Sequence, residues 1–196
     1  MVKRLFDIIF SLIGLVFLAP FLILITIIIK ADSKGPVFYI QKRVGKGNKD
    51  FRLFKFRSMR IDSDISGLLT VGNKDPRITS SGYYLRKYKL DEIPQLYNVL
   101  KGEMSFVGPR PEVRKYVELY NEYQMKVLEV KPGITDLASI KYRNENELLA
   151  DSDDPEGLYT NEIMPDKIEI NLEYISDRSL LKDIRIIIKT LKAVII

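Results

Sequence analysis

Near the start of the chain, residues 5–29 read "LFDIIFSLIGLVFLAPFLILITIII", an apolar run that sets the architecture we expect. It is bracketed by the cations Lys3, Arg4 and Lys30. An α-helix of about 20 apolar residues can cross a bilayer, so this run is long enough to anchor the chain in a membrane. It is too long for the apolar part of a cleavable signal peptide, and no small-x-small site follows it. We therefore expect a membrane helix, in which Asp7 pairs with Lys3 and Arg4 at helical spacing.

Pro20 divides this apolar run. As helices the two arms, residues 5–19 and 21–29, would reach about 22 and 13 Å, so neither crosses a ~30 Å core alone. Proline removes a backbone hydrogen bond and clashes with the preceding turn, which predicts a bend at Ala19 and Pro20. The cations at both ends favour one shared, cytoplasmic side for the two ends. Spanning helices also tolerate proline, so the residues leave a re-entrant hairpin and a kinked span both open.

The residue types that are missing limit the chemistry. The 196 residues contain no histidine and no cysteine. This excludes Ser–His and Cys–His catalysis, disulfides, and metal sites built from imidazole or thiolate. Any nucleophile would have to be a carboxylate, a hydroxyl or a lysine. Any metal would be a hard cation held by oxygen, and Mg²⁺ is the one we expect.

The net charge of +5 is unevenly distributed along the chain. Residues 34–60 contain nine Lys or Arg and one acid, whereas residues 144–177 contain eleven Asp or Glu and one base. A basic region beside an apolar anchor predicts contact with anionic lipid headgroups, with phosphates, or with both. The acidic region is then expected to face away from the membrane.

The rest of the pattern predicts an α+β fold that is mainly α-helical. Aromatic and β-branched residues at 37–45 and 49–59 flank the turn sequence "KGN" and predict a small β-hairpin surrounded by amphipathic helices. A short strand is expected at 137–142. Helices are expected at residues 83–89, 113–130 and 178–196, with another starting at 143–150. The last helix should pack in the core, or contact the membrane, through Ile184, Ile187, Ile188, Leu191 and Ile195.

Two adjacent acids stand at the start of a further helical pattern, "KLDEIPQLYNVLKG", residues 89–102. Its apolar residues recur at helical spacing, and Gly102 supplies a stop. Proline is tolerated in a first helical turn, so Pro94 predicts that this helix starts near Asp91. Capping is the ordinary role of an acid there, and catalysis is the alternative for Asp91 and Glu92.

Phosphoryl chemistry would suit this acid pair. A helix N-terminus would keep Asp91 ionised, and its free N–H groups could bind phosphate oxygens. Arg86, just upstream, and Arg110, held between two prolines, could converge on the same place with Lys55 of the hairpin. A carboxylate, Mg²⁺ and several cations are usual in phosphoryl transfer, because the cations neutralise a diphosphate before an anion attacks it.

Taken together, the motifs resemble those of the bacterial sugar transferases, the monotopic phosphoglycosyl transferases. The matching stretches are "KRLFDIIFSLIGLVFLAPF", "GPVFYIQKRVGKGNKDFRLFKFRSMR", "LRKYKLDEIPQLYNVLKGEMSFVGPRPE", "KPGIT" and "RNE". The resemblance implies that Asp91 attacks the β-phosphorus of a UDP-sugar, releases UMP and passes the phosphosugar to a polyprenol phosphate such as undecaprenyl phosphate. Glu92 would orient the metal-bound phosphate or handle a proton, and Asp91 and Glu92 would hold Mg²⁺. The matched phosphate-binding positions are Lys55, Arg86, Arg110 and, more loosely, Arg143.

The resemblance also favours the re-entrant anchor. Residues 1–32 would form a helix-break-helix hairpin with its bend at Ala19 and Pro20, ahead of a catalytic domain at 33–196 on the cytoplasmic face of the bacterial inner membrane. Two departures are visible: Ala19 replaces the serine that often precedes the proline, and residues 137–139 read Leu-Ala-Ser where larger relatives often have Trp-Ala-Gln. The identity of the sugar therefore does not transfer. The expected partners are a UDP-sugar, a polyprenol phosphate and anionic lipids, but no nucleic acid; a homo-oligomer is left open.

Two other functions stay open on the residues alone. The chain could be a membrane-tethered module that binds anionic lipid or nucleic acid through its basic hairpin without chemistry. It could also be a phosphohydrolase that uses the same site with water as the acceptor. The products formed from a UDP-sugar distinguish all three.

Overall fold

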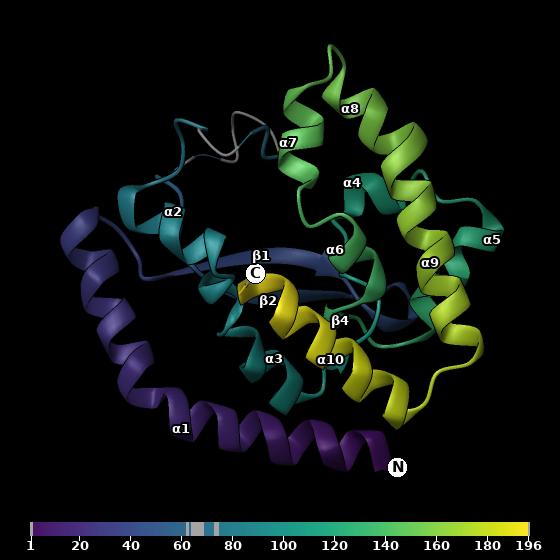
Figure 1. Ribbon diagram of the computed structural model, residues 1–196, viewed down its shortest axis with the longest axis horizontal. Coiled ribbons are helices and arrows are strands. Elements are labelled where there is room, and N and C mark those ends of the chain that lie inside the picture. The colour runs from purple at the N-terminus through teal and green to yellow at the C-terminus, as the bar shows by residue number, and fades with distance from the viewer. Residues whose placement is uncertain (1, 62, 64–68, 73–74, 196) are drawn as a thin grey trace.

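The computed structural model describes residues 2–61, 63, 69–72 and 75–195, and within them the fold is mainly helical with two small sheets (Figure 1). The long helices are α1 (Val2–Asp32), α9 (Met164–Ser176) and α10 (Leu180–Ile195). The short α-helices are α2 (Ser80–Lys87), α3 (Gln95–Lys101), α4 (Arg114–Val117), α5 (Glu122–Met125), α6 (Leu137–Lys141), α7 (Glu145–Ala150) and α8 (Pro155–Leu158). The strands are β1 (Phe38–Val44), β2 (Asp50–Phe56), β3 (Ser105–Val107) and β4 (Gly133–Thr135). The 3₁₀ segments are η1 (Lys46–Asn48), η3 (Leu90–Glu92) and η4 (Lys126–Glu129), and η5 (Tyr159–Ile163) is a π-helix.

The apolar N-terminal run forms α1, an unbroken helix that changes direction along its length (Figure 1). Pro20 lies inside it. Because proline cannot donate a hydrogen bond to the carbonyl four residues earlier, a helix bends where that bond is missing. The predicted break at Ala19 and Pro20 is therefore not observed as an interruption, because one continuous helix runs from Val2 to Asp32 with Pro20 inside it.

One face of α1 packs against the folded body and the opposite face is exposed. The buried residues are Asp7, Ser11, Ile25 and Ile29. On the exposed face, Val16 and Phe17 retain 69% and 83% of their accessible surface. By length and composition α1 could cross a bilayer. An exposed apolar face on such a helix indicates membrane association.

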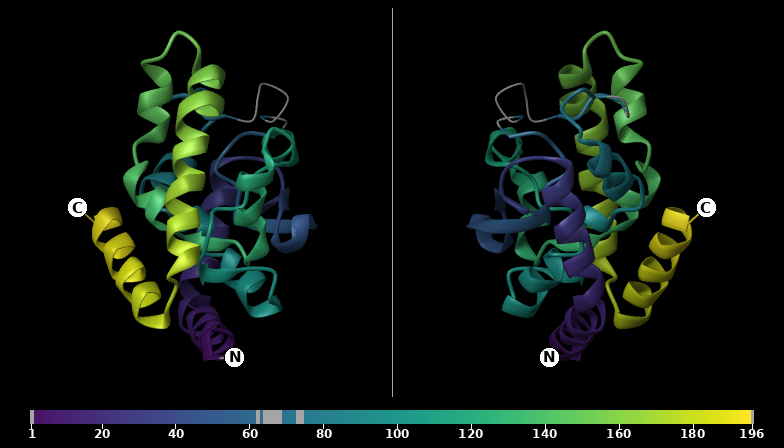
Figure 2. Two further views of the ribbon diagram at one scale, coloured as in Figure 1. Left: turned by 90° about the vertical axis from the view of Figure 1, so that its right-hand side faces the viewer. Right: turned by 90° about the vertical axis from the view of Figure 1, so that its left-hand side faces the viewer.

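Both ends of α1 contact the same folded body, against which the helix lies in the views of Figure 2. Near the N-terminus, Lys3 donates to the Val107 carbonyl over 2.9 Å and pairs with Asp183. Near the C-terminus, Ile25 and Ile29 pack in a cluster with Phe56 and Leu85. The helix is therefore fastened to the body at both ends.

Asp7 does not form its predicted ion pairs with Lys3 and Arg4. Its carboxylate accepts hydrogen bonds from the Ser105 hydroxyl over 3.1 Å and from the Phe106 backbone N–H over 3.3 Å. Lys3 binds the Val107 carbonyl and Asp183 instead, and Arg4 binds the carbonyls of Val99 and Leu100.

The predicted β-hairpin is confirmed. Strands β1 and β2 pair antiparallel, with Phe38 opposite Phe56 and Val44 opposite Asp50. The connecting turn contains Gly47 and Asn48, both with positive φ, a conformation that glycine and asparagine adopt more easily than other residues. The hairpin places Lys55 next to the acid-pair turn.

The second sheet consists of β3 and β4, which pair in parallel. The strand expected at 137–142 is wrong, because residues 137–141 form α6. Asp136 caps that helix by accepting from the Ser139 N–H over 2.6 Å. A capping acid favours helix over strand at the residues that follow it. The extended segment lies just before it, at β4.

The helix expected at 113–130 is interrupted. It is divided into α4, α5 and η4, with α5 starting after Asn121. Asn121 and Gln124 form a capping box, in which each side chain accepts from the other residue's backbone N–H. This local pairing starts a new helix where the apolar periodicity predicted a continuous one.

The C-terminal half is built on α8, η5 and α9, which the sequence did not predict, and on α10. The core cluster at α9 contains Val113, Tyr116, Val127, Leu149, Tyr159, Ile163, Met164 and Ile168. Of the face by which α10 was expected to pack, Ile187 does pack against a core cluster with Val107 and Tyr174, whereas Ile184, Ile188 and Leu191 are exposed. The helix also buries Asp183 and Ile186. The side chain of Ile195 lies outside the described part of the chain.

Candidate active site

The two adjacent acids lie in a tight turn between α2 and α3. Lys89 has a positive φ of 55°, which ends the first helix, and Leu90–Glu92 then form η3. The expected helix start near Asp91 is therefore too early, because α3 begins at Gln95. Pro94 has no N–H to donate, so a 3₁₀ turn joins the acids to α3.

Asp91 lines a cavity of about 450 Å³. Its side chain is buried, and Oδ1 has no hydrogen-bond partner among the residues that the structure describes. Burial and the adjacent charge of Glu92 raise the pKa of Asp91, while Lys55 and Arg86 oppose that rise. The expectation that a helix N-terminus would favour the anion of Asp91 is wrong, because Asp91 precedes α3 and desolvation dominates.

Glu92 faces two cations behind the cavity surface. Arg110 donates to both carboxylate oxygens, over 3.1 Å to Oε2 and by a shorter contact to Oε1. Lys55 donates to Oε1 over 3.3 Å. Burial favours neutral Glu92, but the charges of Arg110 and Lys55 hold its pKa well below the usual range. Glu92 is therefore the buried anion that holds both cations in place.

Lys55 is the titratable cation of the site. Burial lowers the pKa of Lys55 to about 8, although the charge of Glu92 opposes the shift. Its side chain retains only 16% of its accessible surface. Lys55 is therefore positively charged at neutral pH and begins to lose its proton in mildly alkaline solution.

The cavity wall carries more cations than acids. Besides Asp91, its acids are Glu112 and Glu145. The cations that line it are Arg43, Lys55, Arg57, Arg60, Arg86, Arg110 and Lys167. Within the described chain, the side chains of Arg60 and Arg86 have no hydrogen-bond partner, so both can bind a ligand. The size is that of a small-molecule pocket and the charge favours a phosphorylated ligand.

The structure brings together most of the residues predicted for the site. Asp91, Lys55, Arg86 and Arg110 line one cavity, and Glu92 lies directly behind Lys55 and Arg110. Arg143 lies apart. It is exposed, it donates over 3.3 Å to the Ala193 carbonyl of α10, and it does not line the cavity. Its position just before α7 directs it toward the C-terminal helix.

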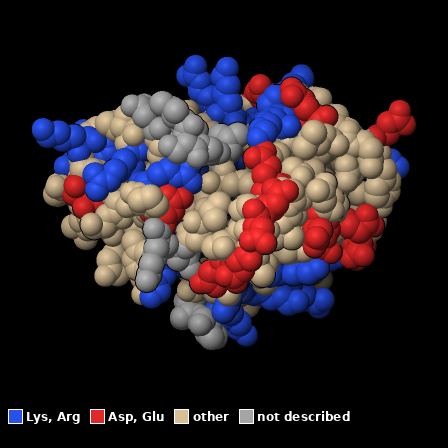
Figure 3. Space-filling view, turned by 90° about the horizontal axis from the view of Figure 1, so that it is seen from above, with Lys and Arg blue, Asp and Glu red and all other residues tan. Residues whose placement is uncertain are grey.

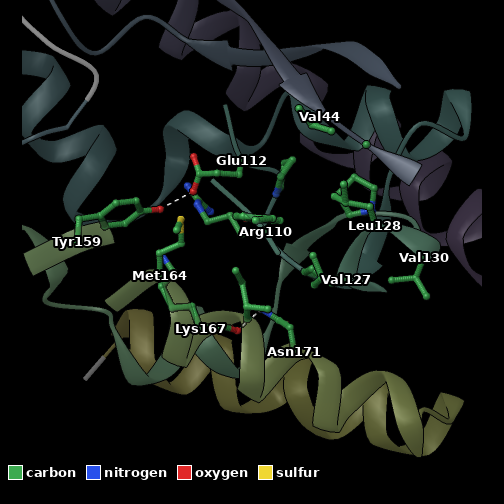
Figure 4. Close-up of a pocket in the computed structure, with 16 residues that line it drawn as sticks. Val44, Arg110, Glu112, Val127, Leu128, Val130, Tyr159, Met164, Lys167 and Asn171 are labelled. Atoms are coloured by element: carbon green, nitrogen blue, oxygen red, sulfur yellow. Dashed lines mark hydrogen bonds between the residues drawn. The ribbon is translucent and has the colours of Figure 1, made fainter. Parts of the chain in front are cut away.

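Several cavity residues were missed by sequence reasoning. Figure 4 shows Arg110, Glu112, Tyr159 and Lys167 around a smaller cavity of about 40 Å³ that adjoins the first. Tyr159 donates to Glu112, whose other oxygen binds Arg43 over 3.1 Å. Tyr159 opens the π-helix η5, and periodicity does not reveal a π-turn. The sequence held one clue that this region contributes to the site, namely Lys167, the single base among residues 144–177.

In the view of Figure 3, acidic side chains form a band across one face of the molecule, and basic side chains lie around it. Several acids of the C-terminal region are paired on the surface, as in Glu156 with Lys115 and Asp166 with Lys141. Asp166, like Glu156, is absent from the cavity wall. One acid of the region 144–177, Glu145, does line the cavity, where it pairs with Lys167 over 2.7 Å.

Comparison with known proteins gives a consistent assignment. A sequence model of the family described as "Bacterial sugar transferase" matches residues 1–196. The chain is 38% identical to "UDP-N-acetylgalactosamine-undecaprenyl-phosphate N-acetylgalactosaminephosphotransferase" of Aeromonas hydrophila, over 99% of this chain and 44% of that protein. It is 47% identical to "Putative undecaprenyl-phosphate N-acetylgalactosaminyl 1-phosphate transferase" of Bacillus subtilis, over 61% of this chain and 66% of that protein. It is 41% identical to "Exopolysaccharide production protein PSS" of Rhizobium leguminosarum bv. phaseoli, over 96% of this chain and 92% of that protein. The chain thus spans less than half of the first relative and just under two thirds of the second.

Proposed function

The chain belongs to the bacterial sugar transferase family, and on that premise we propose that it transfers a sugar 1-phosphate from a UDP-sugar to a polyprenol phosphate, as the first membrane step in making a polysaccharide or glycoconjugate. Undecaprenyl phosphate is the acceptor named for its relatives from Aeromonas hydrophila and Bacillus subtilis. The reaction releases UMP. We assign the reacting group to Asp91.

One observation carries the proposal: Asp91 has a buried, unpartnered carboxylate oxygen in a cavity ringed by cations. A capping acid would have its oxygens bonded to backbone N–H groups, and Asp91 Oδ1 has no such bond within the described residues. A buried polar atom without a partner is costly and is found most often where function requires it. A diphosphate bound by Arg86, Lys55 and Arg110 would place an electrophilic phosphorus at that atom.

In the first step, a carboxylate oxygen of Asp91 forms a bond to the β-phosphorus of the donor. The bond from that phosphorus to the bridging oxygen breaks, and the electron pair leaves with UMP. In the second step, a phosphate oxygen of the lipid acceptor attacks the same phosphorus, and the bond to Asp91 breaks to restore the carboxylate. Burial raises the pKa of Asp91, and the charges of Lys55 and Arg86 oppose that rise and so favour the carboxylate form that attacks.

Glu92 would act through its neighbours. It holds Lys55 and Arg110 on the cavity wall, where their charges can stabilise the negative charge that develops on the transferred phosphoryl group. Among the residues that the structure describes, the Arg86 side chain has no hydrogen-bond partner, so its donors could bind the donor diphosphate. A planar guanidinium binds two phosphate oxygens at once, so arginine suits this position.

The donor set fits Mg²⁺ held jointly with the substrate. No group of three or more acids that could hold a metal occurs among the described residues. Mg²⁺, however, is often bound by one or two carboxylates together with substrate phosphates. Asp91, with its free oxygen, would hold the ion, and Glu92 is engaged by two cations. When bound, Mg²⁺ would neutralise part of the diphosphate charge and polarise its oxygens.

The anchor would enter and leave the membrane on the cytoplasmic side. Both ends of α1 are fastened to one folded body, at Lys3 and at Ile29, which favours a re-entrant helix over a full span. Its exposed apolar residues would lie in the bilayer. This arrangement would hold the cavity at the headgroup plane, where the phosphate of a lipid acceptor lies.

The test is a two-step assay with purified protein, Mg²⁺ and a panel of UDP-sugars. We expect UMP release with one or more donors, an acyl-phosphate adduct on Asp91 by mass spectrometry before acceptor is added, and a lipid-linked sugar after polyprenol phosphate is added. The Asp91→Asn variant should release no UMP and form no adduct. Full turnover by this variant would refute the nucleophile assignment. Free sugar phosphate as the sole product would instead indicate a hydrolase, and binding without UMP a non-catalytic module.

The topology is tested separately by cysteine labelling. The chain has no native cysteine, and Val2 and Lys34 are exposed positions at the two ends of α1. Val2→Cys and Lys34→Cys should be labelled from the same side of sealed vesicles by a membrane-impermeant reagent. Labelling from opposite sides would rule out the re-entrant helix.

A further inference from the structure

Asp7 is an acid buried in an otherwise apolar helix, and nothing in the chemistry above uses it. Only 3% of its surface is accessible. Burying a carboxylate is costly unless it is hydrogen-bonded, and both of its described partners, Ser105 and Phe106, belong to β3. The free-energy cost of burying Asp7 is therefore offset by hydrogen bonds from one short strand, β3, and these bonds join α1 to that strand.

That strand leads directly into the active site. β3 ends at Val107, and Arg110 follows three residues later. The connection is tightly confined: the Gly108 N–H donates to Thr135 over 3.1 Å, and a Cβ on Gly108 would lie 2.4 Å from the Lys131 carbonyl oxygen. Because the backbone between β3 and Arg110 can move so little, a shift of β3 would also shift Arg110. Arg110 is paired with Glu92, so this ion pair would be displaced as well.

The same turn of α1 also holds the other half of the site. Arg4 donates to the carbonyls of Val99 and Leu100 over 2.6 and 2.8 Å. These carbonyls lie at the C-terminal end of α3, a helix of seven residues that follows the Asp91–Glu92 turn. One helical turn of the anchor thus contacts the element that carries the carboxylates and the element that carries Arg110.

We propose that Asp7 is a positioning residue, which holds β3 so that Arg110 meets Glu92 on the cavity wall; this rests on the proposed function. The anchor is then part of the catalytic structure and does more than tether it. Loss of the Asp7 contacts should displace Arg110 while the fold persists, because Lys3 still holds Val107 and the β3–β4 pairing remains.

The test compares Asp7→Ala with a matched control, Ser11→Ala. Ser11 is buried on the same face of α1, but its hydroxyl donates within its own helix, to the Ile8 carbonyl. We expect Asp7→Ala to lower kcat/KM for UMP release about 100-fold, the size of loss that ~1 Å misplacement of a reacting group can cause. Ser11→Ala should stay within about threefold of wild type. Asp7→Asn, which keeps an acceptor oxygen for the Phe106 N–H, should recover most of the loss.

A double-mutant cycle separates positioning from general damage. In an Arg110→Lys background, Asp7→Ala should cost less than about threefold, because the group that it positions is already changed. Additive losses in the cycle would overturn the proposal. So would wild-type activity in Asp7→Ala. A merely structural role would lower the active fraction equally in both backgrounds.

Hydrogen exchange gives a readout that does not depend on turnover. In Asp7→Ala, the amides of residues 104–108 and of Arg110 should exchange at least tenfold faster, with α9 unchanged and Ser11→Ala like wild type. Unchanged exchange at these amides would overturn the positioning role, whatever the activity. If wild-type protein releases no UMP from any donor, the proposed function fails, and the exchange experiment still decides whether Asp7 holds β3.

Discussion

Removing the charge of Glu92 should move the alkaline limit of activity to lower pH. Lys55 has a pKa of about 8 because burial favours its neutral form, and the Glu92 charge 3.3 Å away is the largest influence that opposes this. At an effective dielectric constant of ~20, two unit charges at that distance interact by about 5 kcal/mol, an upper limit that relaxation and the competing charge of Arg110 reduce. We expect Glu92→Gln to lower the pKa of Lys55 by roughly one unit or more, which corresponds to about 1.4 kcal/mol.

The sign of the activity change follows from which form of Lys55 binds phosphate. The protonated form is the one that neutralises a diphosphate, so kcat/KM for UMP release should fall as pH rises through the Lys55 pKa of about 8. Protonation of the nucleophile Asp91, whose pKa is raised by burial, sets a separate limit on the acid side. In Glu92→Gln the fall should begin at lower pH, and the plateau should also drop because Arg110 loses its partner.

The assay is the pH profile of the first half-reaction, measured with one competent donor at fixed ionic strength. Lys55→Arg is the matched control, because arginine stays charged throughout the range and should remove the alkaline limb. Two results would refute the reasoning: an alkaline limb that persists in Lys55→Arg, or a limb in Glu92→Gln at the wild-type pH or above it.

Three further predictions concern which arginines bind the ligand, the backbone conformation at Gly35 and the membrane contact of α1. Arg86→Ala should lower kcat/KM by about 100-fold or more through loss of a charged phosphate contact, whereas Arg143→Ala, outside the cavity, should stay within about threefold; equal losses would contradict the boundary drawn here. Gly35→Ala should lower the free energy of unfolding by more than ~1 kcal/mol, measured by chemical denaturation, because Gly35 has φ +125° and its Cβ would lie 2.1 Å from Arg57 Nη1. Phe17→Asp should weaken vesicle binding about 100-fold in a flotation assay, from a cost of ~3 kcal/mol for a buried acid, while Phe17→Leu should bind like wild type.

Much of the architecture follows from local sequence signals. The apolar run with its internal proline predicted α1, and the aromatic strands around "KGN" predicted the β1–β2 hairpin, because strong periodicity and turn residues act over a few neighbours. The elements that were predicted wrongly are explained by local capping interactions, which outweighed the apolar pattern. A capping acid at Asp136 replaced an expected strand by α6, and the Asn121 capping box interrupted an expected helix.

The candidate site was foreseeable in its residue types and only partly in its arrangement. Asp91, Arg86 and Arg110 were found from their motifs and do share a cavity. The environment of Asp91 was misjudged, because a residue's pKa depends on burial and on charges from distant segments. Tyr159 was missed altogether, since its contact with Glu112 joins positions 47 residues apart through a π-helix.

Composition and short-range spacing were enough to predict a long apolar helix with an internal proline, a basic hairpin and an acid pair suited to phosphoryl transfer. Three other features became visible only in the folded chain: Glu92 faces Lys55 and Arg110, Arg143 lies apart from the cavity, and Asp7 contacts β3. Each of these depends on how distant segments pack. Such packing selects among pairings that local patterns leave equally open, and burial then fixes the charge states of the groups that it brings together.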